Sequence, residues 1–468
     1  MSPTLLRKSR APHRAIRAAC LGLTLLAGAS GLALAAEAPD PDIAGWARTH
    51  LHAVDRVTPD GDFRDLEPLR AIIGDARIVS FGEGMHGAAE PLEFRNRLLR
   101  FLVERMGFTA IAIESGISEG FDVNRYVLGG GEDLAGAVKR GFSFGFAQLP
   151  QETELVRWMR SYNDDPKHAR KIEFYGLDVS GGDDDMELPL RVALNYLDAR
   201  DKGRAASFRA RVADLLPRMH LNRQSEAPNQ YPDLTQAERD GLTGAIADLI
   251  AEFEVHETQW SAATSRRDYA VAYRAAISAR QVDSYLRWVP VGWKPKDGFA
   301  GIFPTVASAD RTKADNLDWV LGQLGRGARV LVFMHRGHLM YTPSTIRLPP
   351  PTGLTTLPPM VGMYMKERYG TENVMIAHLF AAESTQCGAP ARNAPAGTVE
   401  AHLAALPAPL FLLDLRSAPS NVAAWLKADR EEFGMPPLNT VGIGNAYDAV
   451  FFSRSVTRAV ACPAPAAH

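Results

Sequence analysis

Short runs of almost entirely apolar residues alternate along this chain with longer stretches in which apolar residues recur every three or four positions. Runs of the first kind are typical of strands buried on both faces, and the second pattern is typical of amphipathic helices. Since strands that alternate with helices form parallel sheets, the pattern predicts an α/β fold. The predicted strands are Arg77–Gly82, Thr109–Glu114, Lys171–Asp178, Ala328–His335, Asn373–Leu379, Pro409–Leu415 and Tyr447–Phe452.

The stretches between these strands differ in length. Ala88–Arg105 and Gln151–Tyr162 have the helical period and the length of ordinary connections. Residues 186–292 keep the helical period without any strand signal and are longer than an ordinary crossover. We therefore expect a helical insertion at 186–292 that divides the α/β core into the parts 36–185 and 293–468. This insertion would be a lid, one wall of a pocket, or simply additional helical packing.

The N-terminal segment 1–35 has the features of a signal peptide. Basic residues precede the apolar run Ala18–Leu34, and Ala33-Leu34-Ala35 places small residues where signal peptidase cleaves. Because the run is almost long enough to span a bilayer, an uncleaved anchor is the alternative. We expect cleavage, no stable membrane anchor, and a periplasmic or secreted protein. In an oxidising compartment Cys387 and Cys462 would be able to form a disulfide.

Charge excludes some partners. The chain has 54 acidic and 52 basic residues, interspersed along its length, and a formal net charge of -2. Proteins that bind nucleic acids or membrane surfaces usually carry a basic patch or a basic helix. No nucleic-acid or membrane-surface partner is therefore expected.

Ionisable residues stand at the ends of four predicted strands: Glu83 and His86, then Glu114, then Asp178, then the run His335–His338. Open α/β sheets bind ligands outside the carboxyl ends of their strands. A histidine beside a carboxylate can accept a proton near neutral pH. The set therefore predicts a site that activates a water molecule. The alternative is that these residues only cap helices or satisfy loops.

The same residue types are also metal ligands. Nitrogen and oxygen atoms of five residues would be able to hold Zn²⁺, which would generate the hydroxide: Glu83, His86, Glu114, His335 and His338. No His-Glu-x-x-His helix accompanies them. A metal-dependent hydrolase thus remains an alternative, as does a non-enzymatic protein that binds a ligand such as haem.

Two sequences imitate the nucleophile elbow of serine hydrolases, Gly116-Ile-Ser118-Glu-Gly120 and Gly141-Phe-Ser143-Phe-Gly145. Ser118 follows a predicted strand, but several residues too late for the sharp turn. Ser143 follows no predicted strand. We therefore do not expect a serine nucleophile.

The chain resembles the erythromycin esterase family over nearly all of the expected mature chain. The stretches that carry the resemblance are Phe81–Gly87, Glu93–Leu98, Ala112–Glu114, Val123–Val127, Glu154–Asn163, Phe174–Asp178, Arg311 with Asn316, Met334–His338, Met363–Lys366 and Tyr447–Phe452. The resemblance implies a three-layer α/β/α core with a helical insertion. It also implies hydrolysis of a carboxylic ester or lactone of a small molecule without metal or other cofactor. The resemblance also suggests macrolide antibiotics as substrates, and resistance to these antibiotics as a role.

The resemblance assigns catalytic roles to five residues. His86 would be the general base that activates water. Glu83 and Glu114 would orient and polarise that base. His335 would stabilise the oxyanion or complete the proton relay, and Arg95 would hold a carboxylate or support the site.

The chain also departs from the family pattern. Gly84 and Met85 stand where the family usually has a small residue and a hydroxyl residue, and Arg336 stands where it usually has asparagine. A guanidinium directed into the site would favour an anionic substrate. These changes put macrolide opening in doubt while they leave the water-activating residues in place. The expected substrate-binding residues are His338, Arg336, Asp178 and Arg311.

Overall fold

The computed structural model describes residues 42–131, 133–181, 185–219, 230–289, 301, 303–348, 353–385, 390–434 and 440–460. The expected signal peptide, Cys387 and Cys462 lie outside these residues. No helix among the described residues is both long and apolar enough to cross a membrane.

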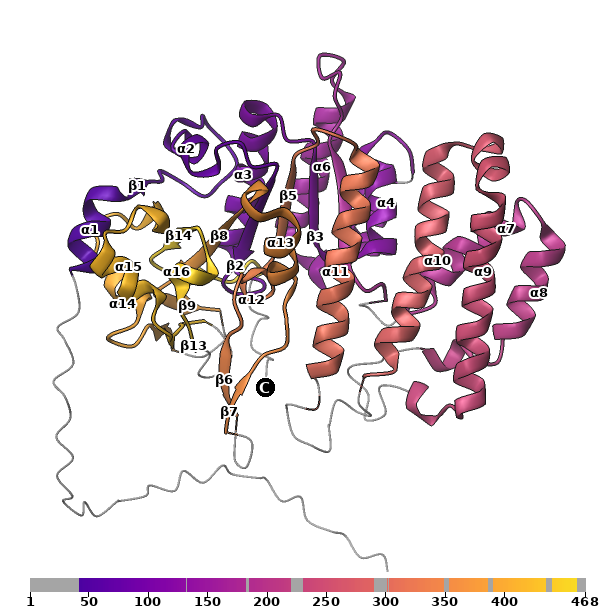
Figure 1. The fold of residues 1–468 in the computed structure, drawn as a ribbon. Helices are drawn as coiled ribbons and strands as arrows, with labels where there is room; N and C mark the ends of the chain where they lie inside the picture. Colours follow the sequence, from indigo (N-terminus) through magenta and orange to yellow (C-terminus); the bar gives the residue numbers. More distant parts are fainter. Residues whose placement is uncertain are drawn as a thin grey trace, which may run out of the picture. The chain divides into compact units, whose positions relative to one another are not determined.

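An eight-stranded sheet forms the centre of the fold (Figure 1), in the order β1-β11-β14-β8-β2-β5-β3-β4. The six strands from β14 to β4 are parallel. At the other edge β11 and β1 run antiparallel. The bounds are β1 His52–Ala53, β2 Ile78–Glu83, β3 Ala110–Gly116, β4 Glu173–Asp178, β5 Val330–His335, β8 Asn373–Phe380, β11 Leu410–Asp414 and β14 Ala449–Ser453. The predicted mainly parallel α/β sheet is confirmed.

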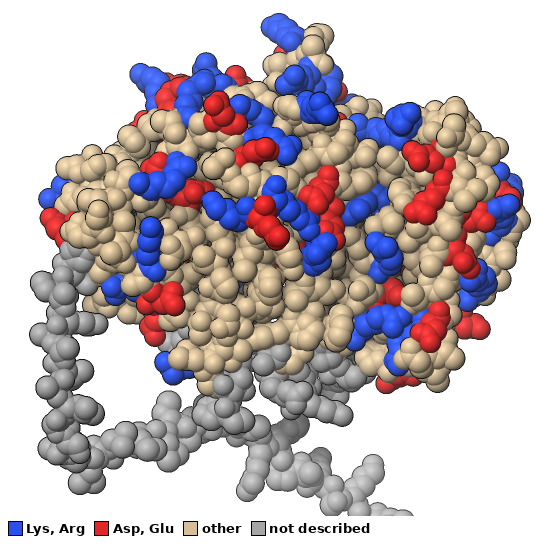
Figure 2. Space-filling model, in the orientation of Figure 1, with Lys and Arg blue, Asp and Glu red and all other residues tan. Residues whose placement is uncertain are grey.

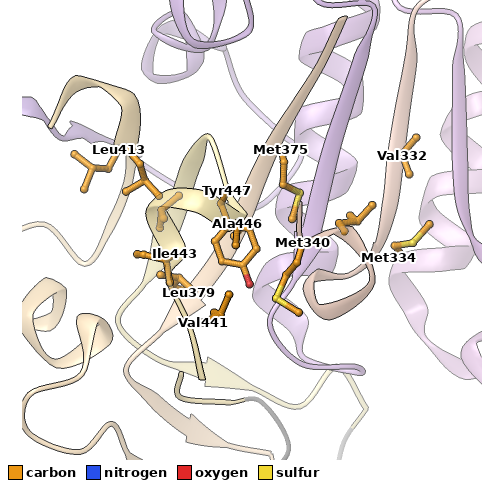
Figure 3. Packing of buried hydrophobic residues seen from close by; sticks show 14 of the residues in the cluster. Val332, Met334, Met340, Met375, Leu379, Leu413, Val441, Ile443, Ala446 and Tyr447 are labelled. Carbon is orange, nitrogen blue, oxygen red and sulfur yellow. The ribbon is translucent and has the colours of Figure 1, made fainter. Parts of the chain in front are cut away.

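Helices cover both faces of the sheet, because successive strand residues point to opposite sides. Ile78 and Val330 pack with α1, α11 and α13 in one apolar cluster, whereas Val79 and Leu331 pack with α2, α3 and α6 in another. Figure 3 shows part of the first cluster, where Val332, Met334 and Met375 of the strands are drawn with Ile443, Ala446 and Tyr447. The bounds are α1 Ile43–His50, α2 Leu69–Ile73, α3 Ala89–Met106, α4 Ile117–Val127, α5 Leu134–Gly141, α6 Pro150–Asp164, α11 Phe303–Leu324, α12 Arg336–Leu339, α13 Val361–Tyr369, α14 Val399–Ala404, α15 Ser420–Lys427 and α16 Ile443–Ala446. The three-layer arrangement therefore agrees with the expectation.

The described residues between Met186 and Val289 contain helices and no strand. The α-helices are α7 Leu188–Asp198, α8 Lys202–Val212, α9 Gln236–Ala263 and α10 Arg266–Leu286. They share an apolar cluster of their own, with Leu249, Phe253 and Val282 at its centre. Thr235 begins α9 with a capping box, in which its hydroxyl and the Glu238 carboxylate bond each other's backbone N–H. In Figure 1 these helices stand beside α4, at the β4 edge of the sheet.

Short strands complete the C-terminal part. They form two small sheets, β12-β13-β6-β7 and β10-β9-β15. Their bounds are β6 Thr345–Leu348, β7 Gly353–Thr356, β9 Ala382–Ser384, β10 Arg392–Asn393, β12 Arg430–Glu431, β13 Thr440–Val441 and β15 Val456–Thr457. On the face drawn in Figure 2, acidic and basic side chains are interspersed, as the sequence predicts.

Candidate active site

The sheet order brings the predicted strand-end residues to one edge. The neighbouring strands β2, β5, β3 and β4 end at or near Glu83, His335, Glu114 and Asp178. The register of β2 and β5 pairs Glu83 directly with His335. Because parallel strands all present their carboxyl ends at the same edge, residues more than 250 positions apart, such as Glu83 and His335, meet there.

His86 and Glu83 form the first pair of the site. Nδ1 of His86 lies 2.6 Å from Oε1 of Glu83. The Glu83 side chain is buried, whereas 45% of the His86 side chain is exposed. The His86 ring centroid lies 4.9 Å from that of His335 and 5.3 Å from that of Phe146. Since Glu83 holds Nδ1, Nε2 is the nitrogen that would accept a proton.

The charges around His86 make it a stronger base. Loss of water around the ring favours its neutral form, but the Glu114 charge and the hydrogen bond and charge of Glu83 prevail and raise the pKa of His86 to about 9. Burial raises the pKa of Glu83, although its bond to His86 acts in the other direction. The pair therefore joins a buried carboxylate to an imidazole that is still partly open to solvent.

Glu114 connects both histidine motifs. Its Oε2 accepts a hydrogen bond from the His335 backbone N–H at 2.7 Å, and its Oε1 lies 3.4 Å from Nε2 of His338. Burial would raise the pKa of Glu114, but the charges of His338, His86 and Lys313 hold it below its usual value. Glu114 is therefore an ionised carboxylate at neutral pH.

His338 belongs to a chain of alternating charges. Its Nδ1 lies 2.9 Å from both carboxylate oxygens of Asp310. Lys313 Nζ lies 3.8 Å from Asp310 and 3.1 Å from Asp178. Burial lowers the pKa of His338, but Asp310 and Glu114 outweigh it and raise that pKa overall. The two carboxylates therefore favour the cationic form of the His338 imidazole.

Sequence reasoning missed Asp310 and Lys313, which α11 contributes. A signal was present, because Asp310, Lys313 and Asn316 recur every three residues on the side of α11 where Leu317 and Val320 are buried. Asn316 is buried too, and its Nδ2 donates to the Leu177 carbonyl at 2.6 Å. Three polar residues along the inward face of a helix indicate a buried polar partner.

His335 has the opposite electrostatic character. Burial, together with the positive neighbours His86, Arg336 and His338, lowers its pKa well below the usual value. Its Nδ1 accepts the Gly337 N–H at 3.2 Å and so caps α12. His335 is therefore neutral and carries its proton on Nε2.

Arg95 is a buried cation next to the site. Its guanidinium is fully buried, donates to Glu152 at 2.8 Å and lies 4.7 Å above the Phe333 ring. Its charge also lowers the pKa of Glu83, as the smallest of the contributions to that group. Arg95 was expected to hold a carboxylate or to support the site, and in the structure the carboxylate that it contacts is the buried Glu152.

The expected substrate-binding roles of Arg336 and Arg311 are corrected by the structure. Arg336 is fully buried and donates to the carbonyls of His378, at 2.8 Å, and Phe433. Its Nε lies 3.4 Å from Glu432. It points neither into the site nor to solvent, because these carbonyl groups and Glu432 hold its guanidinium inside the fold.

Arg311 follows Asp310, and one helical position turns a side chain by about 100°. The Arg311 side chain therefore points outward, where it is 58% exposed and pairs with Asp315 at 3.0 Å. Neither it nor Arg336 is among the residues that line the cavity of the site.

That cavity has a volume of about 410 Å³. His86, Glu114 and Asp178 provide its polar wall. The remaining lining residues are aromatic or apolar: Phe144, Phe146, Val179, Met186, Tyr285 and Ala309. A space of this size with few polar groups fits a small organic molecule. Met186 and Tyr285 come from the helical segment, so that segment forms part of the wall.

The elbow-like serines are not placed as nucleophiles. Ser118 lies in the first turn of α4, is buried, and its N–H donates to Ser180 Oγ at 3.0 Å. Ser143 bonds Ser115, Gly116 and Glu119. Within the described ranges, no three His, Cys, Asp or Glu side chains are arranged as metal ligands would be.

Comparisons with known proteins agree with this fold. A family model described as erythromycin esterase matches residues 103–456, a range that begins after Glu83 and His86. The erythromycin esterase type II of Escherichia coli is 27% identical over 291 residues, which are 61% of this chain and 66%, just under two thirds, of that relative.

Two solved structures show the same fold. A Bacillus cereus protein has a TM-score of 0.72 at 21% identity, covering 90% of this chain and 99% of its own. A mutant of the erythromycin esterase EreC in its open conformation has a TM-score of 0.61 at 18% identity, covering 86% of this chain and 96% of its own.

Proposed function

Because the chain belongs to the erythromycin esterase family, we propose that it hydrolyses a carboxylic ester or lactone of a small molecule by direct attack of water, with His86 as general base and without a metal. The observation that carries this proposal is the His86–Glu83 pair on the wall of the cavity. A carboxylate on Nδ1 fixes the ring orientation and strengthens Nε2 as a base, as water activation requires.

The reaction would proceed in two steps. Nε2 of His86 takes a proton from water while the water oxygen attacks the carbonyl carbon, and Glu83 stabilises the imidazolium that forms. The tetrahedral intermediate then collapses, the bond to the alcohol oxygen breaks, and His86 returns the proton to that oxygen. A carboxylic acid and an alcohol result, or one hydroxy acid when the substrate is a lactone.

The negative charge on the carbonyl oxygen needs a donor. His338 would be a candidate because Asp310 and Glu114 favour its cationic form, but its Nε2 lies 3.4 Å from Glu114 and would have to turn from that carboxylate toward the substrate. His335 is neutral and already hydrogen-bonded to the Gly84 backbone, so it would provide a weaker donor. Lys313 lies behind His338 and is paired with two carboxylates, so it stabilises the arrangement and not the substrate.

The raised pKa of His86 leads to a pH prediction. The neutral base is present only above this pKa, so kcat/KM should rise with pH toward about 9. Glu83→Gln removes a carboxylate that raises the pKa, and we expect the acidic limb of the profile to move down by about one unit or more. The measurement is kcat/KM between pH 5 and 10 for both proteins. An unchanged limb would show that the Glu83 carboxylate does not tune the base.

The reaction class and metal dependence are tested together. Metal-stripped protein is assayed on a panel of esters and lactones, macrolides included, with and without added Zn²⁺ or Mn²⁺. We expect equal turnover in both conditions. Turnover only after metal is restored would favour the metal-dependent alternative, and tight ligand binding without any turnover would favour a binding protein.

We also propose that the protein is exported, which rests on the signal-peptide pattern of residues 1–35. N-terminal sequencing of the mature protein should begin at Ala36. A protein that retains residues 1–35 and stays in the cytoplasm would contradict export.

A further inference from the structure

The two elbow-like sequences, which the proposed reaction does not use, contact each other. The Gly116 N–H donates to Ser143 Oγ at 3.0 Å, and the Ser143 N–H donates to Ser115 Oγ at 2.8 Å. These bonds join the end of β3 to the turn that follows α5. Both serines are buried, so the contact lies beneath the surface of the molecule.

Glu119 extends this contact to a third segment. Its Oε1 accepts hydrogen bonds from the Gly181 N–H at 2.6 Å and from the Ser143 hydroxyl at 3.2 Å. A single carboxyl oxygen therefore joins residues 143–145 to residues 180–181. The carboxyl group fills the space beside Gly116, where a Cβ atom would lie 2.1 Å from Glu119 Oε2.

Both joined segments form the wall of the cavity. Phe144 and Val179, which line it, lie one and two residues from the bonded positions. The Phe144 ring lies 6.0 Å from Phe146, whose ring lies 5.3 Å from His86. Phe144 has a φ of 62°, a left-handed conformation that non-glycine residues rarely adopt. Such a conformation persists only where the surrounding structure holds it.

The hydrogen bonds that Glu119 accepts do not require its carboxyl group to be charged. Burial raises its pKa to about 7, although the Gly181 N–H and the nearby hydroxyls act in the other direction. A neutral carbonyl oxygen accepts the same two hydrogen bonds. Glutamine at this position would therefore preserve the contact, whereas alanine would remove it.

We propose that Glu119 is a positioning residue for the substrate: by joining the 143–145 and 180–181 segments, it holds the Phe144–Phe146 wall against the group that is bound beside His86. The proposal rests on the proposed function only in placing the substrate in this cavity. It makes the aromatic wall the part of the site that recognises an apolar portion of the ester or lactone.

The test compares Glu119→Ala with Glu119→Gln and with Arg125→Gln, a control on the same helix whose exposed guanidinium pairs with Asp122. With a substrate of the wild type, Glu119→Ala should raise KM about tenfold and change kcat much less, because binding and not the base is disturbed. Glu119→Gln should stay within about twofold of wild type. Equal KM values for all variants, or a loss of kcat at constant KM, would overturn the proposal.

Two further measurements separate positioning from general damage. In a Phe144→Ala background, Glu119→Ala should raise KM little further, because both changes act through the same wall. If the effects of the two substitutions on KM were fully additive, Glu119 would not act through Phe144. If Glu119→Ala does not fold, Ser143→Ala removes one of the two Glu119 bonds together with the bond from the Gly116 N–H, and it should also raise KM. Wild-type KM in that variant would contradict the proposal.

Hydrogen exchange gives a readout that needs no substrate. Glu119→Ala should increase amide exchange in segments 141–146 and 178–181, whereas Glu119→Gln should retain the protection. Unchanged exchange in Glu119→Ala would overturn the positioning role by itself. Increased exchange in a protein that hydrolyses no ester would support the contact while the proposed function fails.

Discussion

His86→Ala is expected to remain folded and to lose hydrolysis by about 10²–10⁴-fold, the usual contribution of a general base. The loss should fall on kcat, because His86 moves the proton in the reaction whereas the apolar wall provides most of the contact with the substrate. Folding should survive because the imidazole is 45% exposed. Glu83, left without its partner, can take up a proton, since burial already raises its pKa. The measurements are steady-state kinetics and a thermal melt on the same preparation.

Two matched variants accompany this experiment. His86→Gln keeps a hydrogen-bond donor near Glu83 but provides no base, so it should be as inactive as alanine. His52→Ala removes an exposed histidine from β1, at the far edge of the sheet, and should retain full activity. A folded His86→Ala protein with wild-type rates on every substrate would exclude His86 as the base.

Lys313→Met is expected to lower the free energy of unfolding by about 3–5 kcal/mol, the usual cost of removing one partner from a buried ion pair. Lys313 is only 2% exposed and faces Asp178 and Asp310. Both carboxylates would then be buried without their cation, and the low pKa of Asp310 depends on that charge as well as on His338. The measurement is urea denaturation at pH 7, with the midpoint and the slope compared with wild type.

A second substitution distinguishes charge from packing. Asp178→Asn in the Lys313→Met background removes one of the uncompensated carboxylates, so the double variant should be more stable than Lys313→Met alone. Lys202→Met, at the exposed start of α8, is the control and should change stability by less than about 0.5 kcal/mol. A loss of under about 1 kcal/mol for Lys313→Met would show that the carboxylates do not depend on this lysine.

The strands and most of the candidate site were predictable from local pattern. Apolar runs located all seven expected strands, with shifts of at most two residues at either end. The rule that parallel strands end at one edge then grouped Glu83, Glu114 and Asp178 with the histidines. This worked because a strand buried on both faces must be apolar along its length, so the polar residue that follows it stands out.

Site residues that lie on helices, away from the strand ends, could not be predicted from local pattern. Asp310 and Lys313 belong to α11, and only the packing of that helix against the edge of the sheet brings them to His338 and Asp178. Ser143 and Glu119 likewise meet across different segments. A helix period tells which side of a helix is buried, but it does not tell which strand end that side will face.

Side-chain direction was decided by tertiary structure as well. The sequence alone determined that Arg336 follows His335 at a strand end, and the family resemblance singled out Arg311 together with Asn316. The structure buries Arg336 among carbonyl groups and Glu432, and it turns Arg311 toward solvent. Strand and helix identity depends on local periodicity, which the sequence carries, whereas the target of a long cationic side chain depends on which acceptors the fold places within its reach.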